Sequence, residues 1–133
     1  MTPPRESNVV DAILRYLRAL PDGHARKNHG TQYGTAGEPD VDACVRGRCV
    51  KIEVKRPGAA AKVTALQRAA LDRWSRAGAV AFVATSVDDV RLVLVGHGLV
   101  DDARPPGRRA GGGSREKVSE ALRENGSGPG GVA

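Results

Sequence analysis

The sequence predicts a single α/β domain with a flexible C-terminal tail. Residues 7–20 and 64–77 carry apolar residues at three- and four-residue spacing, which indicates two amphipathic helices. Residues 39–45 and 49–55 alternate apolar and polar residues with a period of two, which is typical of strands. A chain of 133 residues can bury one hydrophobic core and is too short for two ordinary domains. We therefore expect one functional site.

The first element is the helix over residues 7–20, which Pro21-Asp22-Gly23 ends. Its apolar stripe consists of Val9, Val10, Ile13, Leu14, Leu17 and Leu20. Residues 25–28 are compatible with a short strand. The loop from there to Gly37 has no apolar anchor except Tyr33, so we expect it to be mobile.

The next two elements form a β-hairpin. The apolar positions are Val41, Ala43 and Val45 in the first strand and Val50, Ile52 and Val54 in the second. Arg46-Gly47-Arg48 between them is typical of a tight turn. Each strand therefore has one apolar face and one polar face.

A second helix follows an alanine-rich link. Thr64-Ala-Leu-Gln67 has the form of a capping box, in which a threonine hydroxyl and a glutamine side chain satisfy amides at the helix start. The helix should run to about Ala77 and stop at Gly78. We expect its buried face to consist of Leu66, Ala70, Leu71 and Trp74.

The last ordered elements follow directly. Residues 80–85 form a run of small apolar residues, which suits a strand covered on both faces. Ser86 suits the N-cap of a final helix or turn toward Leu94. We place the domain at residues 1–102. Residues 103–133, rich in Gly, Pro and charge, should be disordered, with at most a transient helix at 114–124.

The composition favours an acidic partner and a reducing compartment. The net charge is +6, and residues 103–133 contribute half of it with six basic and three acidic residues. Nucleic acid is the commonest partner of a soluble basic domain. The absence of an 18-residue apolar run and of a signal-peptide pattern predicts a soluble cytoplasmic protein that binds no membrane. Cys44 and Cys49 cannot form a disulfide framework, and we expect both to be reduced.

The hairpin can pair in two registers that both bury its apolar face. A two-residue turn at Arg46-Gly47 places Asp40 opposite Glu53, and a turn at Gly47-Arg48 places Asp40 opposite Lys55. The first register also opposes the two cysteines. Opposed side chains lie ~5 Å apart at Cβ and diagonal ones ~7–8 Å, so two carboxylates here could hold one hard cation. The alternative is that these charges are only the solvated face of a hairpin.

Three features favour the interpretation that these charged residues form a functional site. Pro39 fixes the chain before Asp40, Glu53 and Lys55 stand two apart on one face, and Arg56-Pro57-Gly58 follows at once. In this order, Gly37-Glu-Pro-Asp40, Lys51-Ile-Glu-Val-Lys-Arg-Pro-Gly58 and Leu66-Gln67 resemble the VRR-NUC branch of the PD-(D/E)XK nucleases. The resemblance covers about residues 6–94. It implies a restriction-endonuclease-like core of a helix, a three-stranded meander, a helix and a strand, the order found above. Glu38 departs from the family pattern, which expects a small or apolar residue there.

The resemblance also implies the roles of the central residues. Asp40 and Glu53 would bind a divalent metal, the Val54 carbonyl would complete its site, and Lys55 would orient or activate the attacking water. Mg²⁺ or Mn²⁺ suits such an all-oxygen set, whereas zinc would call for His or Cys ligands.

Further residues are assigned with an alternative beside each. Glu6 matches the family's additional acid, or it is simply a favourable charge at a helix N-terminus. Gln67 matches a glutamine near the site and also belongs to the capping box. The residues expected to hold DNA phosphates, rather than form a scattered basic surface, are Arg26, Lys27, Arg56 and Lys62.

The function expected from this site is metal-dependent hydrolysis of phosphodiester bonds in DNA. The family resemblance implies homodimers that act on branched DNA such as Holliday junctions. One alternative is a non-catalytic nucleic-acid-binding module of the same fold. Another is a general, restriction-type or repair nuclease that cuts ordinary duplex.

Overall fold

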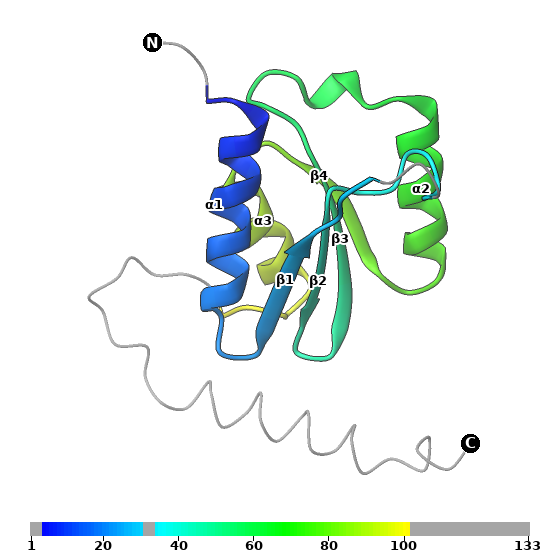
Figure 1. Ribbon diagram of the computed structural model, residues 1–133. Helices are drawn as coiled ribbons and strands as arrows, with labels where there is room; N and C mark the ends of the chain where they lie inside the picture. Colours follow the sequence, from blue (N-terminus) through cyan, green and yellow to red (C-terminus); the bar gives the residue numbers. More distant parts are fainter. Residues whose placement is uncertain (1–3, 31–33, 102–133) are drawn as a thin grey trace. The chain divides into compact units, whose positions relative to one another are not determined.

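The computed structural model describes residues 4–30 and 34–101 as a mixed α/β fold with a four-stranded sheet and three α-helices (Figure 1). The elements are α1 (Glu6–Ala19), β1 (Gly23–Lys27), β2 (Val41–Val45), β3 (Arg48–Val54), a 3₁₀ turn η1 (Ala60–Lys62), α2 (Ala65–Arg76), β4 (Val80–Ala84) and α3 (Val87–Gly96). This is the predicted order of elements. The predictions for residues 103–133, including a helix at 114–124, and for Tyr33 lie outside the described residues.

The sheet has the strand order β1-β2-β3-β4. The first three strands form an antiparallel meander, and β4 pairs parallel to β3. Helices α1 and α3 lie on one side of the sheet and α2 lies on the other (Figure 1). The parallel strand requires a crossover, which α2 supplies.

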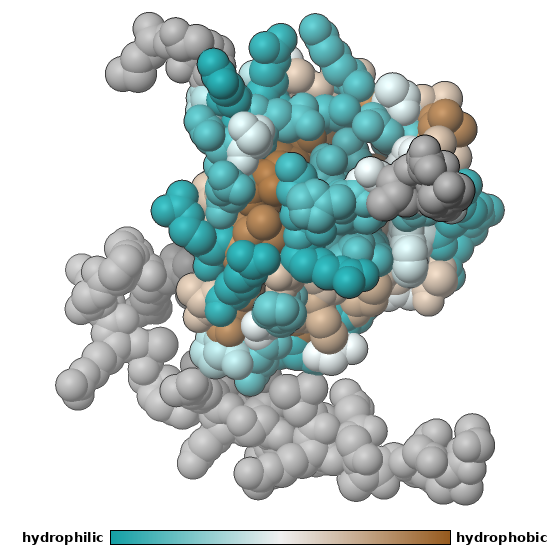
Figure 2. Space-filling view, viewed as in Figure 1, coloured by the Kyte–Doolittle hydropathy of each residue, from teal (hydrophilic) through white to brown (hydrophobic). Residues whose placement is uncertain are grey.

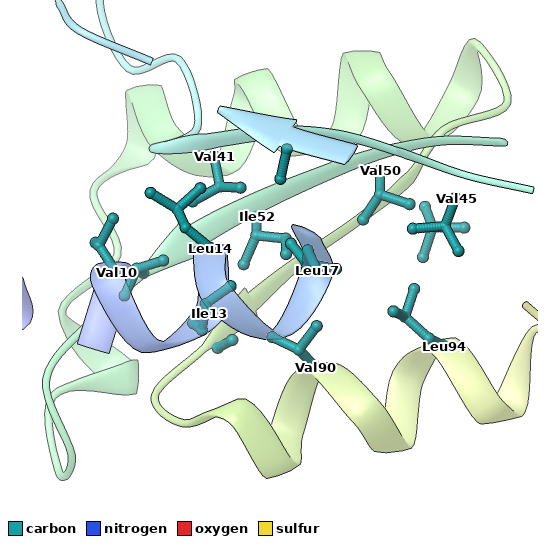
Figure 3. Close-up of a cluster of buried hydrophobic side chains, with 14 of the residues drawn as sticks. Val10, Ile13, Leu14, Leu17, Val41, Val45, Val50, Ile52, Val90 and Leu94 are labelled. Carbon is teal, nitrogen blue, oxygen red and sulfur yellow. The ribbon is translucent and has the colours of Figure 1, made fainter. Parts of the chain in front are cut away.

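The hydrophobic core lies between the sheet and the pair α1 and α3. Side chains of both helices point toward the inward-facing residues of the hairpin, such as Val41 and Ile52 (Figure 3). Ile13, Leu17 and Leu94 are fully buried there. The stripe that predicted the first helix is therefore its core face, although Leu20 follows the last helical residue.

The structure selects the first of the two hairpin registers. Val41 pairs with Ile52 and Cys44 with Cys49, so the turn is Arg46-Gly47. Both turn residues have positive φ, +49° and +78°. Positive φ at both central positions defines the type I′ turn, whose twist matches that of the strands it joins.

The capping signals at the helix ends are confirmed. Thr64 and Gln67 form both hydrogen bonds of the capping box, and the Ser86 side chain accepts from the Asp89 amide at the start of α3. Gly78, with φ of +104°, follows the end of α2. The sequence predicted a short strand at residues 25–28, and strand β1 instead covers Gly23–Lys27. None of the helices in residues 4–30 and 34–101 is long and apolar enough to cross a membrane.

One prediction about α2 was wrong. Leu66 is 61 % exposed and does not belong to the buried face of the helix. The inner positions are instead Gln67, Ala70, Leu71 and Trp74, at the spacing i, i+3, i+4 and i+7. The reason is that α2 covers the polar face of the hairpin, so a glutamine occupies the inner position of its first turn.

Candidate active site

The two central acids lie at neighbouring strand ends. Asp40 immediately precedes β2, and Glu53 is the penultimate residue of β3. The Asn28 amide donates to the Asp40 carbonyl at 2.7 Å, and the Val54 amide donates to Asp40 Oδ2 at 2.8 Å. Backbone and side chain of Asp40 are thus both held, which fixes this carboxylate beside the end of β3.

Glu53 is a buried carboxyl group with incomplete contacts. It is 2 % exposed. Its Oε1 accepts a hydrogen bond from Gln67 Nε2 at 2.9 Å and lies 3.6 Å from Lys55 Nζ. Its Oε2 is buried without a hydrogen-bond partner in the described part of the chain. A buried carboxylate oxygen without a partner destabilises the fold by about 1–3 kcal/mol or more. A proton or a cation bound to this atom would remove that penalty.

The environment raises the pKa of Glu53 to about 8. Burial is the largest cause, followed by the neighbouring carboxyl group of Asp40, while Lys55 acts in the opposite direction. Ionisation of the buried Glu53 carboxyl group beside a second carboxyl group is costly unless a cation joins them.

This shift predicts a pH-dependent stability in the presence of a chelator. Folded Glu53 keeps a proton up to about pH 8, whereas the ordinary pKa of a glutamate side chain is 4.5. The stabilisation is therefore full below pH 4.5 and is lost as the pH rises through 8. Chemical denaturation should give an unfolding free energy that falls across this range, by at most about 1.4 kcal/mol per pH unit for one proton. Glu53→Gln should flatten the slope and exposed Asp72→Asn should not; equal slopes in the two variants would contradict the shift.

Gln67 takes part in the capping box and also contacts Glu53. Its amide Oε1 accepts from the Thr64 amide at 3.0 Å, while its Nε2 donates to Glu53. The cap fixes the oxygen end of the side chain, so the nitrogen end must point toward the carboxylate. This hydrogen bond holds the first turn of α2 beside the candidate site.

A second set of contacts joins α2 to the segments that carry the acids. Trp74 Nε1 donates to Glu38 Oε2 at 2.8 Å, and Lys51 Nζ lies 3.9 Å from the centroid of the Trp74 ring. Lys51 also donates to Asp42 at 2.8 Å. Sequence reasoning assigned no role to this cluster. A usable signal was present, because Trp74 follows Gln67 by seven residues and Lys51 precedes Glu53 by two on the same face.

Trp74→Phe tests how much the hydrogen bond from Trp74 to Glu38 contributes to stability. It keeps an aromatic ring over Lys51 but removes the donor to Glu38, so we expect a loss of about 1–2 kcal/mol in unfolding free energy. Glu38→Gln retains an acceptor oxygen and should cost less. Urea denaturation of both variants makes the comparison, and a Trp74→Phe protein as stable as the wild type would show that the bond contributes nothing.

The donor set fits a hard divalent cation. Asp40 and Glu53 offer carboxylate oxygens, one of them without a partner. In an antiparallel strand the amide and carbonyl of one residue point to the same neighbour, so the Val54 carbonyl shares the side on which its amide meets Asp40. Oxygen donors suit Mg²⁺ or Mn²⁺. Within residues 4–30 and 34–101 no group of three or more His, Cys, Asp or Glu is suited to a metal, so Glu6, exposed at the start of α1, is not brought to these acids.

The four basic residues predicted to bind DNA phosphates lie in two separate places. Arg26 and Lys27 line a hollow of about 490 Å³ together with Arg18, Asn28 and His29. A second hollow of about 550 Å³ shares Asn28 and His29 and extends to Asp40. Arg26 also lies 3.5 Å from Asp42. Arg56 and Lys62 are exposed beyond the end of β3. The face drawn in Figure 2 is mostly hydrophilic, with a narrow strip of apolar residues beside α1.

Comparison with solved structures finds a similar fold. The chain resembles a protein described as "VRR_NUC domain protein" with a TM-score of 0.58 and 18 % sequence identity, over 70 % of this chain and 87 % of that one. No protein-family model matches the sequence. The search of curated proteins also gave no match. At this identity the likeness concerns the fold: a mixed α/β domain of the kind found in a VRR_NUC protein.

Proposed function

We propose that this protein is a divalent-metal-dependent deoxyribonuclease with a PD-(D/E)XK active site formed by Asp40, Glu53 and Lys55. The observation that carries the proposal is the buried Glu53 carboxyl group, with one oxygen lacking a partner, beside Asp40 and 3.6 Å from Lys55 Nζ. A hairpin face that is merely solvated would leave such a group in water. The fold similarity to a VRR_NUC domain protein supports the same conclusion.

Each residue has a distinct task in this proposal. Asp40, Glu53 and the Val54 carbonyl would hold Mg²⁺ or Mn²⁺, which supplies a water of lowered pKa and neutralises charge on the phosphate. Lys55 places a cation beside the scissile phosphate and orients the attacking water. Gln67 fixes the rotamer of Glu53 through its hydrogen bond. Glu6 is not needed for this arrangement.

Binding of the substrate is assigned to the basic residues. Arg26 and Lys27, in a hollow that adjoins the one reaching Asp40, would hold phosphates on one side of the site. Arg56 and Lys62 would do so on the other. A purely binding module of the same fold is the second candidate, but clustered acids would repel the phosphates that it must bind.

We further propose branched DNA as the substrate and a homodimer as the active form. A four-way junction requires two symmetric cuts, whereas one copy of this chain offers one acidic site. Two copies related by a two-fold axis would supply both cuts. Light scattering measures the mass, and a stable monomer that makes paired cuts would refute this part.

The experiment that tests the function is a cleavage assay on the full chain. Labelled linear duplex, single strand, flap and four-way junction are each incubated with Mg²⁺, Mn²⁺ or EDTA. We expect cutting with either metal and none with EDTA, with the junction preferred. Equal cutting of linear duplex would favour a general nuclease. Binding without cutting under every condition would favour the non-catalytic module.

A further inference from the structure

The two cysteines form a pair at the turn end of the hairpin. Cys44 in β2 and Cys49 in β3 are directly opposed in the ladder, and both are free and exposed. The chain contains two cysteines in all. They share the sheet face of Asp40 and Glu53 but lie four residues away along each strand, ~13 Å, so they stand apart from the candidate active site.

The hydrogen-bond pattern shows which kind of pair they make. The carbonyl of Asp40 and the amide of Arg46 are both bonded to the β1 side, at Asn28 and Asp22. Because backbone groups alternate in direction along a strand, those of Cys44 also point toward β1 and away from β3. Cys44 and Cys49 are therefore a non-hydrogen-bonded pair, the closer of the two kinds, with Cα atoms ~4.5 Å apart. Disulfides span Cα separations of ~4.4–6.8 Å, so the bond can form without moving the backbone.

The surroundings leave the pair open to reagents. Helix α2 contacts β3 and β4, whereas the pair lies over β2 and β3 at the end where the strands turn. The residue opposite Cys44 on the other side is His24 of β1, which is also exposed. Exposed disulfides are more easily reduced than structural ones.

We propose that Cys44 and Cys49 constitute a reversible dithiol–disulfide site that exchanges with small-molecule disulfides of the glutathione class. The thiolate of one cysteine attacks glutathione disulfide and releases one glutathione thiolate, which leaves a mixed disulfide. The second cysteine thiolate then attacks the protein sulfur of that bond and releases the second glutathione. Two protein thiols are oxidised, one glutathione disulfide is reduced to two glutathione molecules, and the thiol protons pass to the buffer and the released glutathione.

The bond would fix the hairpin in the register that the structure shows. Any slip that separates Cys44 from Cys49 also shifts Asp40 relative to Glu53, since these two residues directly follow the Val41–Ile52 pair at the other end of the ladder. Oxidation is therefore expected to raise the melting temperature and leave the fold unchanged. This inference does not depend on the proposed nuclease function, and its test contains no cleavage assay.

The test equilibrates the full chain in glutathione buffers of graded potential, with acid quenching, thiol titration and mass spectrometry. We expect the wild type to lose both thiols together and two hydrogens in mass, with no glutathione attached and a Cys44–Cys49 cross-linked peptide. Cys44→Ser and Cys49→Ser serve as matched controls, and each should stop at a mixed disulfide that carries one glutathione.

Two results would overturn the proposal. One is a wild-type protein whose cysteines each retain glutathione, as independent thiols would. The other is oxidation that yields only disulfide-linked dimers at low protein concentration. Phenylarsine oxide, which bridges two neighbouring thiols, gives a second measurement on the reduced protein. One molecule should bind the wild type and protect both cysteines from alkylation, whereas failure to protect them would count against a close pair.

Discussion

Lys55→Ala and Glu53→Gln are each expected to lower metal-dependent DNA cleavage by at least about a hundredfold. Lys55 supplies the cation beside the scissile phosphate, and Glu53 carries the buried oxygen that lacks a partner. Neither change alters the apolar core. Binding to an uncleaved four-way junction in EDTA should therefore persist, and single-turnover cleavage in Mg²⁺ measures the loss.

Asp72→Asn is the matched control for the loss of a carboxylate charge. Asp72 lies exposed on α2, outside the proposed site, and should leave cleavage unchanged. Thermal melts of all three variants separate a chemical loss from unfolding. Near wild-type cutting by either Lys55→Ala or Glu53→Gln would show that the proposed active site is wrong, even if the protein cuts DNA.

Gly37→Ala is expected to have the largest effect on stability. Gly37 has φ of +83°, and a Cβ there would lie 2.7 Å from the Leu66 carbonyl carbon and 2.8 Å from its oxygen. These are backbone atoms of the first turn of α2, so they cannot rotate away. Left-handed φ costs about 1–2 kcal/mol for a residue with a Cβ, and overpacking adds about 1–3 kcal/mol. We expect a total loss of about 2–5 kcal/mol in urea denaturation.

Gly58→Ala provides a control with the same backbone angle. Gly58 also has φ of +83°, but a Cβ there would meet no heavy atom within 4 Å. This variant should lose only the conformational part, about 1–2 kcal/mol. The difference between the two variants measures how tightly the loop before Asp40 packs on α2. If the two variants prove equally stable, that packing does not hold the loop.

The sequence by itself determined the order of the elements and the placement of Asp40, Glu53 and Lys55 close to one another. Alternation in the hairpin left two registers, and both brought Asp40 and Glu53 onto one face with Lys55. Local signals, such as the capping box at Thr64 and Gln67, were also sufficient, because their hydrogen bonds join residues three apart. Such contacts depend only on residues that are close in the sequence.

Only the tertiary structure decided which helix covers each face of the hairpin. Periodicity cannot tell whether an inner helix position meets an apolar or a polar surface, so the sequence predicted that Leu66 is buried, whereas it is exposed and Gln67 occupies the inner position. The choice of register required the positive φ angles of Arg46 and Gly47. The burial of Glu53 required α2 to pack over it, and the bond from Trp74 to Glu38 joins residues 36 positions apart. Such pairings depend on how elements distant in the chain meet, which local patterns do not encode.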